Sequence, residues 1–184
     1  MPNRFEQPAF YLQSGDPETE NAPTLAYPGQ LGVRFTVIQP SRSTAGVESG
    51  RSKRYQLIRS DSTMTVAPYP GATAWWSDKA QYLVTTNATN RNRVAGVFQN
   101  AVTPGNYGCI QIGGPATVKL LDADMANVAI GEAIIPSATN AKATRVAVGT
   151  APTHTVLGWV AGPALSTDPP SATVVVDLAM PETT

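Results

Sequence analysis

Proline and glycine interrupt this chain so often that long helices have little room to form. Its 184 residues include 16 prolines and 15 glycines. Proline removes a backbone donor and clashes with the preceding helical turn, while glycine favours turns. The segments between these residues are short, and several alternate apolar with polar side chains, as β-strands do. The sequence therefore predicts an all-β protein and argues against alternating strands and helices.

The expected strands are short and separated by turns. The clearest covers residues 31–39, where apolar and polar side chains alternate. The others cover 55–59, 63–67, 74–76, 82–86, 94–100, 109–112, 116–121, 132–135, 143–148, 156–160 and 173–178. Roughly eight to twelve such strands predict a compact β-barrel or β-sandwich of short antiparallel strands.

Turn-forming residues and helix-capping residues add detail to this prediction. PYPG at 68–71 and TPGNYG at 103–108 predict tight turns, and residues 40–54 predict a polar loop. The Gly-Gly-Pro sequence at 113–115 predicts a break between two strands. Residues 122–130 predict one short helix, with Asp122 as its N-cap and Asp124 in its first turn.

Residues 1–30 are interpreted as an extended N-terminal arm ahead of a β-rich domain of residues 31–184. Five prolines in this stretch disfavour both helix and central strand. An arm of this kind orders on a neighbouring subunit through apolar anchors; the alternative is a mobile chain terminus. The candidate anchors are Phe5, Phe10, Tyr11, Leu12, Leu25 and Tyr27.

Charge and cysteine content bound the partners and the compartment. Thirteen basic and 13 acidic residues cancel, which argues against nucleic acid as the main partner. The first residues lack the apolar core of a secretion signal, and no stretch has membrane-spanning length, so we expect folding in the cytoplasm and no membrane partner. The single cysteine, Cys109, leaves no intrachain disulfide and is expected to face the core.

The side chains that carry catalysis form no recognisable motif. His154, the single histidine, would have to act as the base of a nucleophilic site, but no G-x-S-x-G sequence accompanies it. Asp122, Asp124 and Glu132 do not match the spacing of a calcium loop. The glycine-rich stretch 105–114 lacks the order of a phosphate-binding loop. We therefore expect no enzyme activity, metal, cofactor or small-molecule substrate.

Two features are candidates for protein interfaces. Basic side chains concentrate around Arg51, Lys53 and Arg54, which suits docking onto an acidic surface; a solvated basic loop is the alternative. Trp75 and Trp76 are adjacent, so in a strand their indoles lie on opposite faces. One is expected in the core and the other at the surface, in a neighbour's pocket or under the arm.

The segment KAQYLVTTNATNRNRVAGVFQNAVTPGNYGCIQIGGPATVKL, residues 79–120, resembles small capsid decoration (cement) proteins of tailed bacteriophages. The segments GEAIIPSATNAKATRVAVG and VLGWVAGPAL extend the resemblance. It implies a structural protein without enzymatic activity that binds the phage major capsid protein on the outer surface of the virion. It also implies a homotrimer or homodimer that bridges neighbouring capsomers.

Two alternatives to a capsid decoration protein are compatible with the sequence. Within structural proteins, the chain is a component of a phage tail, fibre or head–tail connector. From a different class, it is a carbohydrate-binding β-module that presents Trp75 or Trp76 to a sugar ring.

Overall fold

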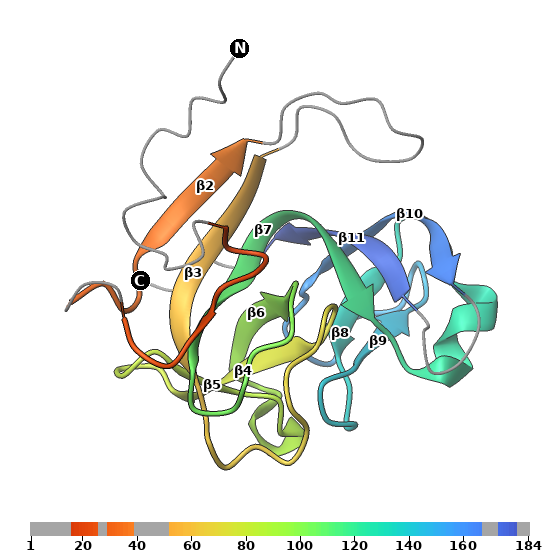
Figure 1. Cartoon of the computed structure of the whole chain (residues 1–184). Coiled ribbons are helices and arrows are strands. Elements are labelled where there is room, and N and C mark those ends of the chain that lie inside the picture. Colours follow the sequence, from red (N-terminus) through yellow and green to blue (C-terminus); the bar gives the residue numbers. More distant parts are fainter. Residues whose placement is uncertain (1–15, 26–28, 39–51, 167–172, 180–184) are drawn as a thin grey trace.

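One long strand, β7 (Tyr107–Lys119), belongs to two sheets and organises the whole structure (Figure 1). This computed structural model describes residues 16–25, 29–38, 52–166 and 173–179. The other strands are β1 (Asn21–Ala22), β2 (Arg34–Ile38), β3 (Ser52–Ser60), β4 (Thr73–Asp78), β5 (Leu83–Thr85), β6 (Val94–Phe98), β8 (Ala133–Pro136), β9 (Ala143–Val146), β10 (Gly158–Ser166) and β11 (Thr173–Ala179).

The first half of β7 takes part in a closed barrel. The strands follow the order β3, β5, β4, β6, β7, and the pairing of β7 with β3 completes the ring. Every pair is antiparallel except β3 with β5. Side chains alternate along a strand, so one face of each strand points into the barrel. Buried residues of this core include Ile58, Trp76, Val84, Phe98 and Ile110.

The second half of β7 begins another sheet, in the order β7, β11, β10, β8, β9. Neighbouring strands in it are antiparallel. An isolated bridge between Leu120 and Ala143 brings β9 back to the end of β7. Val118, Ile134 and Leu157 belong to the separate core of this sheet. The prediction of an all-β fold is confirmed, and of the two architectures left open the structure has the barrel.

The Gly-Gly-Pro sequence lies inside β7, so the predicted strand break is wrong. Gly114 has a φ of +76°, and an added Cβ would approach the Ser52 carbonyl oxygen to 2.2 Å. The buried Gln111 side chain spans the bend and donates to the carbonyls of Gly113 at 3.0 Å and Pro115 at 2.8 Å. The strand continues because β3 pairs with it before the bend and β11 after it.

The predicted short helix is present as a 3-10 helix over Asp122–Asn127. Its N-cap is Leu121, which makes no side-chain capping bond, so the assignment of Asp122 as N-cap is wrong. Asp122 instead accepts from Lys142 Nζ at 3.2 Å, and Asp124 accepts from Thr144 Oγ1 at 2.6 Å. A second 3-10 helix, Ala88–Asn90, was not predicted.

Two loop assignments also change. Residues 63–67 were expected to be a strand but form bends, because Asp61 Oδ1 accepts from both the backbone and the hydroxyl of Thr63 and turns the chain. Residues 52–54 were expected in a loop but begin β3, where they pair with β2. The turn at 68–71 is confirmed, with Gly71 at a φ of +87°.

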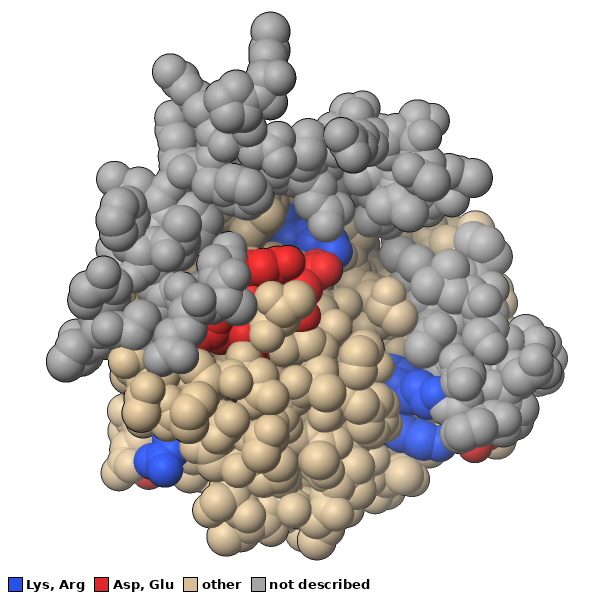
Figure 2. Space-filling view, viewed as in Figure 1, with Lys and Arg blue, Asp and Glu red and all other residues tan. Residues whose placement is uncertain are grey.

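Residues 16–25, part of the predicted arm, lie against the barrel of their own chain. β1 pairs with the start of β7, and Glu20 and Ala22 are buried there. Figure 2 shows acidic side chains gathered at one place on this face, where residues 16–25 cross the barrel in Figure 1. Residues 1–15 lie outside the described residues, so an arm that reaches a neighbour stays a prediction.

Candidate functional site

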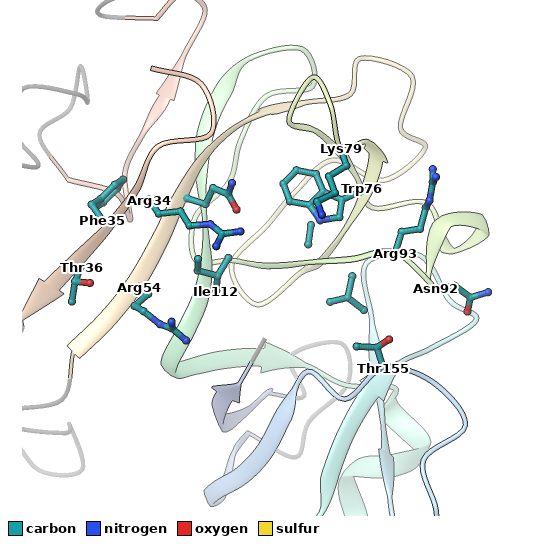
Figure 3. A pocket seen from close by; sticks show the side chains of 13 residues that line it. Arg34, Phe35, Thr36, Arg54, Trp76, Lys79, Asn92, Arg93, Ile112 and Thr155 are labelled. Atoms are coloured by element: carbon teal, nitrogen blue, oxygen red, sulfur yellow. The ribbon is translucent and has the colours of Figure 1, made fainter. Parts of the chain in front are cut away.

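The mouth of the barrel opens into a pocket of about 410 Å³ (Figure 3). One wall continues the barrel interior, because Gln56 lies two residues from the core residue Ile58 and Ile112 lies two from Ile110. Mouths of β-barrels are common ligand sites. The described lining residues are Arg34, Phe35, Thr36, Arg54, Gln56, Trp76, Lys79, Asn92, Arg93, Val94, Ala95, Ile112 and Thr155.

Four cationic side chains line this pocket, and they come from separate parts of the chain. Arg34 lies on β2 and Arg54 on β3, while Lys79 follows β4 and Arg93 precedes β6. Arg34, Lys79 and Arg93 are exposed, and Arg54 is half-buried. The described lining includes no aspartate or glutamate. The pocket therefore presents a positive potential that favours anionic ligands.

The pairing of β2 with β3 fixes two of these cations. Arg34 pairs with Gln56 and Thr36 pairs with Arg54, so these side chains share the pocket face of the hairpin. The Arg54 guanidinium lies over Gly113, where an added Cβ would approach Nε to 2.5 Å. The missing side chain at Gly113 leaves the space that Arg54 occupies.

Trp76 forms an apolar wall of the pocket and is held from behind by Tyr82. The two rings meet edge to face, with centroids 6.3 Å apart and planes at 69°. Tyr82 has a φ of +51°, which is uncommon outside glycine. Its ring lies so close to Gly32, at a φ of +87°, that an added Cβ there would approach the ring to 2.2 Å. Two left-handed residues thus position the ring that supports the pocket wall.

The composition of the pocket is that of an anion-binding site with apolar walls. Arginine presents a planar fork that matches a carboxylate or phosphate. General acid–base catalysis needs a group that exchanges a proton near neutral pH, and the described lining contains no carboxylate, histidine or cysteine. Nowhere in the described ranges do three histidine, cysteine, aspartate or glutamate side chains gather as metal ligands.

Neither protein-family models, nor curated proteins, nor solved structures match this chain. Its function must be inferred from the pocket, the exposed surface and the sequence. Among the residues that the structure describes, no helix has the length and apolarity needed to cross a membrane.

The predicted basic cluster is divided by β3. Arg54 faces the pocket, whereas Lys53 points the other way and donates to Glu18 Oε1 at 2.8 Å. The Tyr55 hydroxyl donates to the same oxygen at 2.5 Å. Burial alone would raise the pKa of Glu18, but the bonds from Lys53 and Tyr55 and the charge of Lys53 hold that pKa below its ordinary value. Arg51 lies outside the described residues.

Both tryptophans of the adjacent pair are buried, so the alternative that leaves one of them at the surface is wrong. Trp75 is 0% and Trp76 7% exposed. Strand alternation does place them on opposite faces, but both faces of β4 are covered. Trp76 points into the barrel core, while Trp75 pairs in register with Val94, which packs on the core of the second sheet.

One predicted arm anchor is used within the chain. Leu25 packs against the buried Tyr55, Leu57 and Cys109 on the outside of the barrel. Cys109 is buried as predicted, and burial, aided by nearby acidic groups, raises the pKa of its thiol well above the ordinary value. The anchors that lie outside the described residues are Phe5, Phe10, Tyr11, Leu12 and Tyr27.

The side chains weighed for catalysis have local partners. His154 Nδ1 lies 3.0 Å from the hydroxyl of its neighbour Thr153. Glu132 is buried, where its Oε1 accepts from Arg145 Nη1 at 2.7 Å and its Oε2 accepts from the Ala129 backbone at 3.0 Å. The side chains of His154 and Glu132 therefore contact other residues of the fold.

Sequence reasoning missed three pocket cations and an exposed tryptophan. Arg34 alternates with Phe35 in a clear strand pattern, so its exposure was foreseeable. Lys79 and Arg93 lie in unrelated loops, and nothing in the sequence links them to β2. Trp159 is 48% exposed on β10. Its alternation with the buried Val160 was a usable signal.

Proposed function

We propose that this chain is a non-enzymatic structural protein of a tailed-phage virion. In this proposal it binds the outer surface of the capsid, through the major capsid protein, and stabilises the shell by bridging neighbouring capsomers. The segments that resemble decoration proteins correspond to β5 through β10, so the resemblance extends over parts of both sheets. The low content of charged residues, 14%, is consistent with a surface that packs against other proteins.

The observation that carries the proposal is an exposed apolar surface on the second sheet. Trp159 is 48% exposed, Ile130 67% and Val148 75%. Trp159 lies opposite Ala133 on β8, which in turn lies opposite Val146 on β9. This row of side chains therefore shares one face of the sheet, with Ile130 just before β8 and Val148 just after β9.

Large apolar side chains grouped on a surface mark sites of protein association. Tryptophan in particular is enriched among residues that dominate binding energy. A capsid offers the same contact many times around its symmetry axes, so a contact of modest strength is reinforced when oligomers bind several sites at once. A shell surface is the occupant to which we assign this face.

The alternative that uses Trp75 or Trp76 as a sugar platform loses its basis, because Trp75 is fully buried and Trp76 is only 7% exposed. A sugar platform requires an exposed ring face. A glycan array screened with the natural chain and with Trp159→Ala examines the remaining exposed indole.

The proposal is tested by mixing the purified protein with undecorated shells of the phage that encodes it, in both immature and expanded forms. Bound copies are counted after the shells are pelleted. We expect saturation at a number fixed by shell symmetry. We also expect the triple variant Ile130→Ser, Val148→Ser and Trp159→Ser to bind at least about tenfold more weakly.

Gln81→Ala is the control, because Gln81 is an exposed side chain outside this surface. It should bind like the natural protein. Failure of the natural protein to pellet with either form of shell contradicts the proposal and favours a tail component. Equal binding by the triple variant contradicts the assignment of this surface.

A further inference from the structure

The cationic pocket at the barrel mouth is unused by the shell-binding surface, which lies on the second sheet. We propose that this pocket binds an acidic segment of a partner protein, with carboxylates at Arg34, Lys79 and Arg93 and an apolar side chain at the wall to which Val94, Ile112 and Trp76 contribute. This inference goes beyond capsid binding, since it defines the chemistry of a bound segment whichever protein carries it.

The first argument is charge complementarity. Thirteen basic and 13 acidic residues balance over the whole chain, yet the described pocket lining holds four cations and no carboxylate. Three cations outside the pocket form ion pairs within the chain: Lys53 with Glu18, Lys142 with Asp122, and Arg145 with Glu132. The exposed cations Arg34, Lys79 and Arg93 make this concave site complementary to a compact group of carboxylates.

The second argument is the mixed character of the walls. Trp76, Val94 and Ile112 line the same space as the cations. In Figure 3, Arg34 extends from β2 into the pocket, while Trp76 and Lys79 lie on the opposite wall. A bare anion would leave the apolar walls uncovered. A segment that alternates acidic and apolar side chains covers both kinds of wall.

Nucleic acid fits this arrangement less well. Nucleic acid binding needs a track of cations that follows the phosphate backbone over several nucleotides. Here Arg59 is an exposed cation of the same strand as Arg54. Its guanidinium carbon lies 5.7 Å from the centroid of the Tyr107 ring, and its Nε donates a hydrogen bond to the Gly105 carbonyl. The pocket cations therefore do not continue into a track along β3.

The position of β2 favours an extended peptide as the occupant. β2 is the terminal strand in the order of the sheet, and within the described ranges its outer edge has no paired strand. Edge strands accept an added strand through backbone hydrogen bonds, while side-chain pockets provide specificity. Arg34 projects from this strand into the pocket (Figure 3), and Thr36 also lines the pocket.

The experiment uses the full chain and an array of short synthetic peptides. Each peptide contains two glutamates and one phenylalanine in varied spacing, and each has a matched peptide with glutamine in place of glutamate. We expect a subset of the glutamate peptides to bind and their glutamine counterparts not to bind. Affinity for the best peptide is then measured by calorimetry with the natural chain and with variants.

The informative variant is Arg34→Gln with Arg93→Gln, because both side chains are exposed and their removal leaves the core intact. We expect affinity to fall at least about tenfold. Arg59→Gln is the matched control, since it removes the same charge from an exposed arginine outside the pocket, and should leave affinity unchanged.

Three outcomes overturn the proposal. They are the absence of any preference for glutamate over glutamine, equal binding by the double variant, and displacement of the peptide by phosphate or a single-stranded oligonucleotide at lower concentration than by free peptide. Failure of shell binding with peptide binding retained would reject the capsid proposal alone. The reverse result would reject the pocket proposal alone.

Discussion

The buried side-chain amide of Gln111 donates a hydrogen bond across the bend of β7 to the carbonyl of Pro115, at 2.8 Å. The same nitrogen donates to the Gly113 carbonyl at 3.0 Å. These two carbonyls lie where β7 leaves the barrel and enters the second sheet. One side chain thus satisfies the backbone at the point where proline and glycine weaken a strand.

Replacing Gln111 with Met keeps the length of the side chain and removes its donor. We expect the free energy of unfolding to fall by about 1–3 kcal/mol, because buried carbonyls lose their partner. Urea unfolding followed by circular dichroism measures the change. Gln81→Met, an exposed position, is the control and should have little effect. Equal stability of the two variants would show that the amide bonds do not hold the bend.

Gly32 and Gly29 form a matched pair for testing the support of Trp76. Both have a φ of +87°, but an added Cβ meets nothing within 4 Å at Gly29 and meets the Tyr82 ring at 2.2 Å at Gly32. Gly29→Ala should destabilise by about 1–2 kcal/mol through its backbone conformation alone. Gly32→Ala should destabilise more and alter near-ultraviolet circular dichroism, because Tyr82 is displaced from Trp76. Indistinguishable spectra would contradict the proposed support.

Gly113→Ala tests the pocket without altering its charge. The added Cβ would meet only side-chain atoms of Arg54 among its three nearest neighbours, so Arg54 must move while the backbone stays. We expect weaker binding of the acidic peptide with a small change in melting temperature. Gly131→Ala, where the added atom meets nothing, should leave affinity unchanged. Unaltered affinity in Gly113→Ala would remove Arg54 from the binding site.

Glu18 gives the stability a defined dependence on pH. Its folded-state pKa is lowered, so its contribution is present above the unfolded value of about 4.5 and is lost as pH falls through the folded value. Glu18→Gln should therefore show a shallower loss of stability in this acidic range than the natural protein. Lys53→Met should act in the same direction, because it removes one cause of the lowered pKa. Parallel acid-unfolding curves for all three proteins would contradict this linkage.

Much of the fold could be predicted because its signals are local. Strand alternation predicted the core of β2, and proline with glycine predicted the turn at 68–71. The continuity of β7 could not be predicted, since it depends on Gln111 and on pairing with β3 and β11. The burial of Trp75 also depends on a distant element, the second sheet.

The pocket was beyond prediction for a related reason. Its cations come from β2, β3 and two loops, which only the closed barrel brings together. Lys53 and Arg54 are neighbours in sequence with similar charge, yet strand alternation directs one to Glu18 and the other to the pocket. Composition identified a basic segment, and the register of β3 determined which of its members face the pocket.

Because β7 is a member of both sheets, neither sheet can melt without taking a strand from the other. The barrel would lose its closure with β3, and the second sheet would lose its pairing with β11. The two halves of the molecule are therefore one cooperative unit, and a load applied to the second sheet passes into the barrel through a continuous backbone.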